Sequence, residues 1–280
     1  MKQNKKKSKR VIPGFGLSFG IMVSILSLIV VIPLCSLVVY SAKLSPEEFV
    51  QTITKPRVVS SYLVSLKTSL IAALVDAAMG TIIAWVLVRY EFRGKKIMNG
   101  MIELPFALPT AVAGIALTHL TTTDGWLGSF FNRFGIKIAY TKIGITVALI
   151  FIGIPFVVRA VQPVLEHIDQ QYEEAANILG ANAIQTFFKV IFPEIFPALL
   201  GGLTLSFARG LGEYGSVVFI AGNQPYETEI VPLMIMAELQ EYDYASATSI
   251  ALVMLFAAFI ILFISAVIQS RTSKIVSGIG

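Results

Sequence analysis

Long runs of apolar residues dominate the chain and recur six times along it. A helix needs roughly 20 such residues to cross a hydrocarbon core of about 30 Å, and it satisfies its own backbone hydrogen bonds while doing so. The pattern therefore predicts an all-α membrane protein with six transmembrane helices, at about residues 17–40, 60–88, 101–120, 143–161, 197–221 and 245–269.

The positions of Lys and Arg predict the orientation of these helices. Cytoplasmic loops are enriched in Lys and Arg. Alternate loops of the predicted topology differ in this respect, and one side carries the six cations near the N-terminus, the cluster around residues 89–96, Lys189, Arg271 and Lys274. We therefore expect both termini in the cytoplasm. The expected organisation is a basic tail at 1–16, one transmembrane domain at 17–270 and a short tail at 271–280.

Composition supports the membrane interpretation and makes nucleic-acid binding, a disulfide and a Cys-based metal site poor interpretations. Hydrophobic residues make up 55% of the 280 residues and charged residues only 14%, an unusual balance for a soluble domain. The net charge of +5 could suggest nucleic acid, but much of the excess lies in the N-terminal tail. We expect contact with membrane lipid and no nucleic acid. One cysteine, Cys35, excludes a disulfide or a Cys-based metal site within the chain.

A polar loop at about residues 164–196 interrupts the apolar pattern between the fourth and fifth helices. Its pattern predicts two short helices. Asp169 is placed to cap the first helix and Gly180 to end it in a left-handed conformation. The second helix is expected at about 183–191, stopping at Pro193. The first helix presents small and aliphatic groups, which suit either docking of another protein or packing against the chain itself.

At this loop the chain resembles a known family. Glu174-Ala175-Ala176, Gly180, Val190 and Phe192-Pro193 follow the spacing of the EAA loop of ABC importer permeases. The resemblance implies a type I ABC importer permease fold in the bacterial cytoplasmic membrane. It also implies that this loop docks in a groove of a separate ATPase, through Glu174, Ala175, Ala176, Leu179, Gly180 and Pro193.

The resemblance makes this chain a non-catalytic subunit of an ATP-dependent translocase. ATP and magnesium are then bound by the partner ATPase, and this chain binds no cofactor. The sequence agrees, because it contains no G-x-x-x-x-G-K-[ST] run that could form a phosphate-binding loop.

Three further stretches, at 103–117, 208–223 and 240–252, resemble sulfate/thiosulfate permeases. They imply import of sulfate or thiosulfate by alternating access. The implied partners are a related but nonidentical second permease subunit, two ABC ATPase subunits and an external sulfate-binding protein. A molybdate or tungstate permease is the alternative, because these anions are also tetrahedral dianions.

Charged residues inside the predicted helices are candidates for the translocation pathway, since ionisable groups are costly at membrane depth. Arg209 and Glu213 are four residues apart on the fifth helix, so they share a face and can neutralise each other. Arg209 could gate the passing anion or form a structural pair with Glu213. Lys67 could be a second pathway cation or could extend its amine to the outer surface.

Two other groups of residues follow from the patterns of the third and fifth helices. Pro109 and Thr110 lie in a proline- and glycine-containing stretch that could kink the third helix at the pathway. Ordinary helix distortion is the alternative. Tyr214 and Ser216 follow Glu213, and the family resemblance implies that they line the central pathway.

The external loop at 222–244 combines acidic residues with apolar residues at helical spacing. Its acids are Glu227, Glu229, Glu238, Glu241 and Asp243. The pattern predicts an outer amphipathic helix, which either docks an external binding protein or packs on its own bundle.

Two other classes of function fit the sequence less well. A membrane enzyme would need a nucleophile with His and acid partners, or a metal cluster, and neither pattern is visible. An ion-coupled secondary transporter would be expected to show more helices and an inverted repeat.

Overall fold

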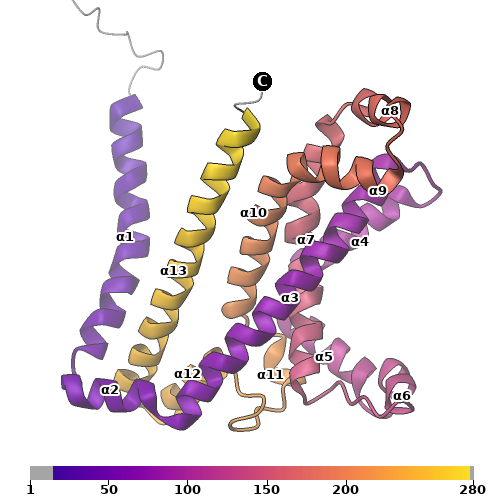
Figure 1. Ribbon diagram of the computed structural model, residues 1–280. Helices are drawn as coiled ribbons and strands as arrows, with labels where there is room; N and C mark the ends of the chain where they lie inside the picture. Colours follow the sequence, from indigo (N-terminus) through magenta and orange to yellow (C-terminus); the bar gives the residue numbers. More distant parts are fainter. Residues whose placement is uncertain (1–14, 278–280) are drawn as a thin grey trace, which may run out of the picture.

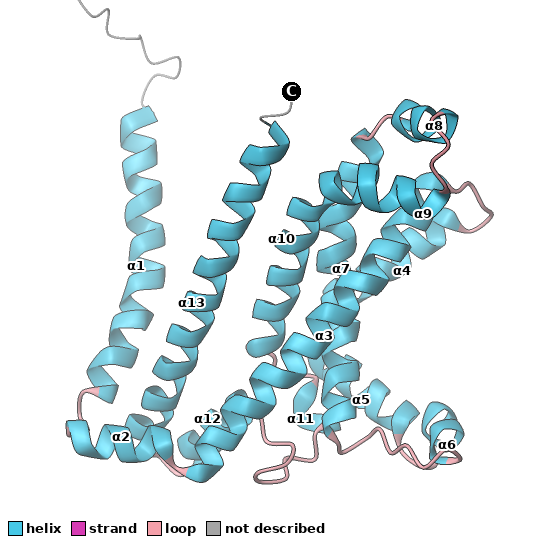
Figure 2. Cartoon of the chain, viewed as in Figure 1, coloured by secondary structure: helices cyan, strands magenta, loops and turns pink. Residues whose placement is uncertain are grey.

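The computed structural model describes residues 15–277, and every regular element in this range is a helix (Figure 2). The predicted basic tail up to residue 14 and the last three residues of the chain lie outside the described range. The helices are α1 Phe15–Ser41, α2 Pro46–Thr54, α3 Pro56–Arg89, α4 Lys95–Ala107, α5 Thr110–Thr121, α6 Trp126–Asn132, α7 Lys142–His167, α8 Gln170–Ile178, α9 Ala183–Thr186, the π-helix η1 Phe187–Ile191, α10 Phe192–Leu211, α11 Val217–Ile220, α12 Val231–Gln240 and α13 Tyr244–Ser277.

Among the described residues, five helical segments are long and apolar enough to cross a membrane: α1, α3, α7, α13 and the continuous segment Ala183–Leu211. The pair α4 and α5 passes the same test only when taken together, and its two halves are bent by 111°. The predicted number of six spans is therefore reached if this bent pair counts as one span.

The long helices give the molecule two distinct ends (Figure 1). The start of α1, the end of α13, α8 and α9 lie at one, which we call the α8 end. Helices α2, α6 and α12 lie at the other, which we call the α12 end. The centre is formed by α3, α7 and α10, which pack on one another. Near the α8 end their core contains Ala84, Leu87, Val157, Leu165 and Ile195.

The third predicted span, 101–120, is not one continuous helix, and the kink that its prolines and glycine suggested is present as a full break. It breaks after Ala107, and Leu108 adopts an extended conformation with φ −85° and ψ 137°. The residue before a proline is disfavoured in the helical region, which explains why the break falls just before Pro109. Pro105, by contrast, lies inside α4 without ending it.

The sequence predicted that the second helix of the polar loop stops at Pro193, and this prediction is wrong. The helix continues from α9 through η1 into α10, where Pro193 occupies the first turn. Immediately before it, the N–H of Phe192 bonds the carbonyl of Phe187, five residues back. A π-helical turn of this kind widens the backbone ladder, and a proline in a first turn removes little hydrogen bonding.

The fifth predicted span, 197–221, is also interrupted. Helix α10 ends at Leu211 with Gly212 as its C-cap, and a non-helical turn precedes the short α11. The helix predicted in the loop at 222–244 is present as α12, whose Val231, Leu233 and Met234 are buried.

Helix α1 stands apart from this core. Its apolar window has no buried residue, and it packs against α13. The hydroxyls of Ser41 and Ser249 share a hydrogen bond of 3.0 Å between their Oγ atoms.

Candidate functional site

The polar loop forms a short capped helix, α8, at the extremity of the bundle. As predicted, the carboxylate of Asp169 caps it by accepting the N–H of Gln171 at 3.0 Å. Gly180 has φ +84°, and the N–H of Ala181 bonds the carbonyl of Ala176 at 3.0 Å. This six-to-one bond is the Schellman closure that a left-handed glycine permits. The caps fix where α8 begins and ends.

The residues predicted to dock an ATPase are mostly exposed on this loop. Glu174, Ala175, Leu179 and Gly180 are exposed, whereas Ala176 is buried against the rest of the chain. Pro193 is exposed but lies in the first turn of α10 rather than on α8. The structure therefore brings the α8 residues onto one loop and leaves Pro193 on the next helix.

Apart from Leu179, the large apolar side chains that accompany these residues were not assigned to docking from the sequence. Ile178 and Leu179 are 86% and 87% exposed. We call the exposed apolar side chains of α8, α9 and η1 the tip patch: Tyr172, Ile178, Leu179, Ile184 and Phe188. Exposed apolar residues gathered in a polar loop are typical of a protein interface. Their signal in the sequence was apolar residues at helical spacing in an otherwise polar loop.

The two helix breaks lie against each other. A Cβ on Gly114 would lie 2.6 Å from Cα of Ser216, and one on Gly215 would overlap the side chain of Thr110. The start of α5, at Pro109 and Thr110, is therefore in direct contact with the turn between α10 and α11. Only residues without a side chain allow so close an approach.

Glu213 is the centre of that turn. Its side chain is 1% exposed and accepts the N–H of Ser216 at 2.8 Å and the hydroxyl of Ser216 at 3.0 Å. Arg209 forms an ion pair with it, Nη1 to Oε2, at 2.6 Å, and remains 37% exposed. Tyr214 is 37% exposed beside them. The ion pair predicted from the spacing of four is present, although Glu213 lies just beyond the helix end.

Lys67 is not part of this group. It is exposed on α3, and no hydrogen bond or ion pair joins it to another residue that the structure describes. The structure thus brings together Pro109, Thr110, Arg209, Glu213, Tyr214 and Ser216, and places Lys67 elsewhere.

Three polar pairings between helices were not foreseen from the sequence. The hydroxyl of Ser206 on α10 donates to Oδ2 of Asp76 on α3 at 2.5 Å, and Asp76 is fully buried. Arg159 on α7 forms an ion pair with Glu103 on α4. Arg89, at the end of α3, pairs with Glu173 of α8 at 2.6 Å. For Asp76, Glu103 and Arg159 the available signal was a charge inside an apolar run. In all three pairings the partners are distant in sequence.

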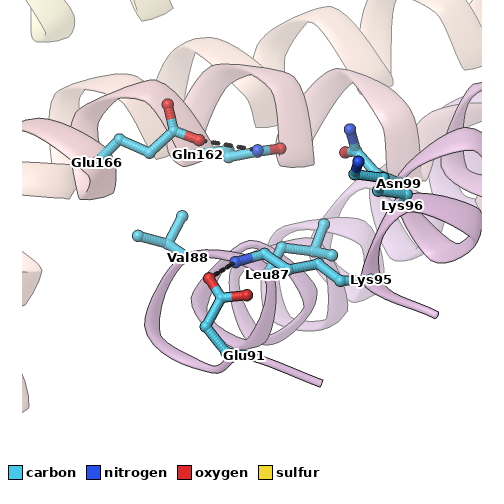
Figure 3. Close-up of a pocket in the computed structure, with 8 residues that line it drawn as sticks. All are labelled: Leu87, Val88, Glu91, Lys95, Lys96, Asn99, Gln162 and Glu166. Carbon is cyan, nitrogen blue, oxygen red and sulfur yellow. Dashed lines mark hydrogen bonds and ion pairs between the residues drawn. The ribbon is translucent and has the colours of Figure 1, made fainter. Parts of the chain in front are cut away.

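A hollow of about 410 Å³ opens between α3, α4 and α7 near the α8 end (Figure 3). Nζ of Lys95 contacts Oε1 of Glu91 at 2.7 Å, and Nε2 of Gln162 donates to Oε1 of Glu166 at 2.9 Å. Lys96 also faces this hollow. Two lysines and two glutamates balance, so the lining does not favour a dianion. Within 15–277, no three His, Cys, Asp or Glu side chains gather as a metal site.

The loop before α12 is held tightly on α3. Arg57 donates from Nε and Nη2 to the two carboxylate oxygens of Glu229, at 2.8 and 2.7 Å. The hydroxyl of Ser60 donates to the carbonyl of Tyr226 at 2.8 Å, and the N–H of Val231 donates to Oγ of Ser65 at 2.8 Å. Three contacts therefore fix this loop to the first turns of α3.

The expectation that Glu229 contributes to an outer acidic surface is wrong, because its side chain is 1% exposed and paired with Arg57. Glu227, Glu241 and Asp243 are exposed. Hydrogen bonds from the side chain and backbone of Ser246 hold the pKa of Asp243 below its ordinary value, and burial raises the pKa of Glu238.

Residues 76–274 match the family described as binding-protein-dependent transport system inner membrane component. The sulfate transport system permease protein CysT of Salmonella typhimurium is 46% identical over 271 residues, covering 97% of this chain and 98% of that protein. CysT of Synechocystis is 48% identical over 244 residues, 87% of this chain and 85% of that one.

Two solved structures resemble the fold. A bacterial alginate ABC transporter in complex with a pentasaccharide-bound periplasmic protein matches with a TM-score of 0.75 at 18% identity, over 93% of this chain and 96% of that chain. The MetNI methionine ABC transporter matches with a TM-score of 0.60 at 16% identity, over 76% and 95%. These likenesses confirm the predicted ABC importer permease fold.

Proposed function

This chain belongs to the family of inner-membrane components of binding-protein-dependent transport systems, and on that premise we propose that it is the permease subunit through which an ABC importer moves sulfate. The observation that carries the substrate is identity of 46% over almost the whole length of permeases named for sulfate transport. Thiosulfate, a tetrahedral dianion of similar shape, belongs to the same proposal.

The proposed orientation places the α8 end in the cytoplasm, together with both chain termini. Arg93 in the α3–α4 loop and Lys96 in the first turn of α4 lie at this end, and cytoplasmic loops are enriched in such residues. Impermeant maleimide tests it on a Cys35→Ser background. Cys introduced at Gln171 of α8 should react only from the cytoplasmic side, and Cys introduced at Tyr226 only from outside. Reversed labelling would refute the orientation.

The tip patch is the proposed docking surface for the ATPase. Its exposed aliphatic groups would fill a groove, and exposed Glu174 would pair with a cation at the rim. In this proposal two ATPase subunits bind ATP and magnesium, whereas this chain binds no cofactor and performs no catalysis. A related, nonidentical permease subunit completes the pore. A capped helix carried by two long helices can convert ATPase closure into helix tilting.

The contact between the two helix breaks is the proposed pathway. Arg209 is held by Glu213, and Glu213 is in turn held by Ser216. A cation fixed in this way, yet 37% exposed, can offer its remaining N–H groups to a passing dianion. Unwound backbone at membrane depth is tolerated where it lines a cavity, which favours the turns at Pro109 and Tyr214 as pathway walls.

The exposed acids near α12 are the proposed docking surface for the external sulfate-binding protein. A negative outer surface would repel free sulfate, so delivery by an enclosing protein suits it better. Because Arg57 and two serines fix the neighbouring loop on α3, this surface is held in one position before the partner arrives.

The deciding experiment is uptake by the assembled complex in vesicles, with ATP inside and each anion presented outside on its binding protein. We expect ATP-dependent sulfate uptake. Uptake of molybdate in place of sulfate would overturn the substrate, and uptake driven by an ion gradient without ATP would overturn the importer.

A further inference from the structure

Arg89 joins α8 to α3, a helix that is not next to it along the chain. It is the last residue of α3, and its Nη2 contacts Oε1 of Glu173 at 2.6 Å. The same nitrogen donates to the carbonyl of Ile168, between α7 and α8, at 3.3 Å. Chain connectivity already ties α8 to α7 and, through α9 and η1, to α10. Helix α3, in contrast, is joined to α8 through side-chain contacts alone.

Burial makes each charge of this ion pair depend on its partner more than in a surface pair. The side chains of Arg89 and Glu173 are 10% and 23% exposed, and removal of one partner would leave the other charge poorly solvated. The guanidinium also lies 5.7 Å from the ring centroid of Trp85, one turn earlier. Arg89 is therefore held from two sides, with little freedom to leave Glu173.

Trp85 extends the connection to the other arm of the loop. Its ring meets that of Phe187 in η1 edge-on, with centroids 5.6 Å apart. Both arms of the loop therefore contact the last turns of α3, one through an ion pair and the other through an aromatic pair. Of the two, the ion pair is the one that reaches α8 itself.

Helix α3 is suited to carry a displacement from one end of the molecule to the other. It is continuous over 34 residues, about 51 Å at 1.5 Å per residue. Its opposite end holds the loop before α12 through Arg57, Ser60 and Ser65. A movement imposed at Arg89 therefore reaches the α12 end through a single uninterrupted rod.

We propose that Arg89 is a positioning residue that makes α3 move with α8, so that the loop before α12 responds to the ATPase. The proposal rests on the proposed function of this chain as an importer permease. Without Arg89, α8 still docks and moves α7 and α10, but α3 and the outer loop lag behind. The ATPase then turns over with less transport for each ATP hydrolysed.

The test compares Arg89→Gln with Arg93→Gln in the assembled complex in vesicles. Arg93 is a matched control, since it is exposed four residues later and has no partner among the residues that the structure describes. In R89Q we expect sulfate uptake to fall about tenfold while ATP hydrolysis stays within about twofold, a typical size for coupling between sites. R93Q should match the wild type.

The charge-reversed pair R89E/E173R should restore a large part of the uptake lost in R89E. Equal losses of uptake and hydrolysis in R89Q, or no rescue by the reversed pair, would overturn the proposal.

A second measurement does not depend on sulfate. Spin labels at Asn177→Cys on α8 and Ile82→Cys on α3, in a Cys35→Ser background, report the distance between the helices by double electron–electron resonance. We expect one narrow distribution in the wild type and a broad one in R89Q. An unchanged distribution in R89Q would overturn the role of Arg89, whereas absence of sulfate uptake by the wild type would overturn only the substrate.

Discussion

Replacing Arg57 by alanine tests how strongly the loop before α12 is held. Glu229 accepts two hydrogen bonds from Arg57, at 2.7 and 2.8 Å, and its side chain is 1% exposed. Arg57 is 39% exposed. The two partners are therefore not equivalent, because a carboxylate stranded by R57A has no access to water, whereas a guanidinium stranded by E229Q can turn toward it.

This asymmetry sets the expected magnitudes. Removal of one partner of a buried pair costs about 3–5 kcal/mol, and partial hydration around Arg57 places R57A at about 3 kcal/mol. E229Q should cost only about 1 kcal/mol, since a neutral amide replaces the charge. At about 2–4 °C per kcal/mol for a chain of this size class, R57A lowers Tm by roughly 6–12 °C.

Thermal unfolding of the purified complex in one detergent measures these differences. R57A should show the largest fall in Tm, E229Q a small fall, and R57A/E229Q an intermediate one, because neutralising the stranded carboxylate relieves part of the cost. A wild-type Tm in R57A, or a double variant less stable than R57A, would refute this account of the loop.

Three further substitutions have defined outcomes. Gly153→Ala should cost about 1–3 kcal/mol by forcing a methyl against Asp76 and Ser206. Gly20→Ala, with nothing within 4 Å, should not lower Tm, because alanine favours a helix over glycine. Equal losses of Tm would refute the close packing at Gly153. Ile178→Asp should weaken ATPase binding in a pull-down titration by about 30-fold, whereas Tyr226→Asp at the other end should leave it unchanged. Normal ATPase binding by I178D would exclude the tip patch as the docking surface.

Asp243→Ala should lower stability by about 1 kcal/mol at pH 7 through loss of a helix cap. Because the pKa of Asp243 is held below its ordinary value of 3.8, the stabilisation is complete above that value and is lost as pH falls through the lower folded value. The Tm difference between D243A and wild type should therefore persist to pH 5 and shrink only in stronger acid; a difference that vanishes by pH 5 would contradict the assignment.

The features that the sequence predicted correctly depend on local information. The apolar runs mark the spans because any helix that crosses the hydrocarbon core needs such a run, whatever its neighbours in the fold. The caps at Asp169 and Gly180 follow from hydrogen bonds within a few residues. The pairing of Arg209 with Glu213 is likewise local. In each case the physical cause and the residues that show it lie within one or two helical turns.

The features that it missed depend on partners far along the chain. Pro105, Pro109 and Pro193 are the same residue type, yet only Pro109 marks a break. The break at Pro109 is packed against Gly215, which no local pattern reveals. In the sequence Arg89 is one of several cations in a basic loop, and only the structure places Glu173 beside it. Long-range pairing, rather than propensity, decides these positions.

The packing of α1 on α13 has a consequence for biosynthesis. Ser41 and Ser249 meet across 208 residues of chain. At about 5–20 residues per second, a ribosome needs roughly 10 to 40 s to make that length. During this interval α1 lacks the helix on which it packs, and its uncharged sequence suits exposure to lipid. The first helix to be inserted is thus among the last to be packed, and a chain stopped before α13 leaves it without its partner.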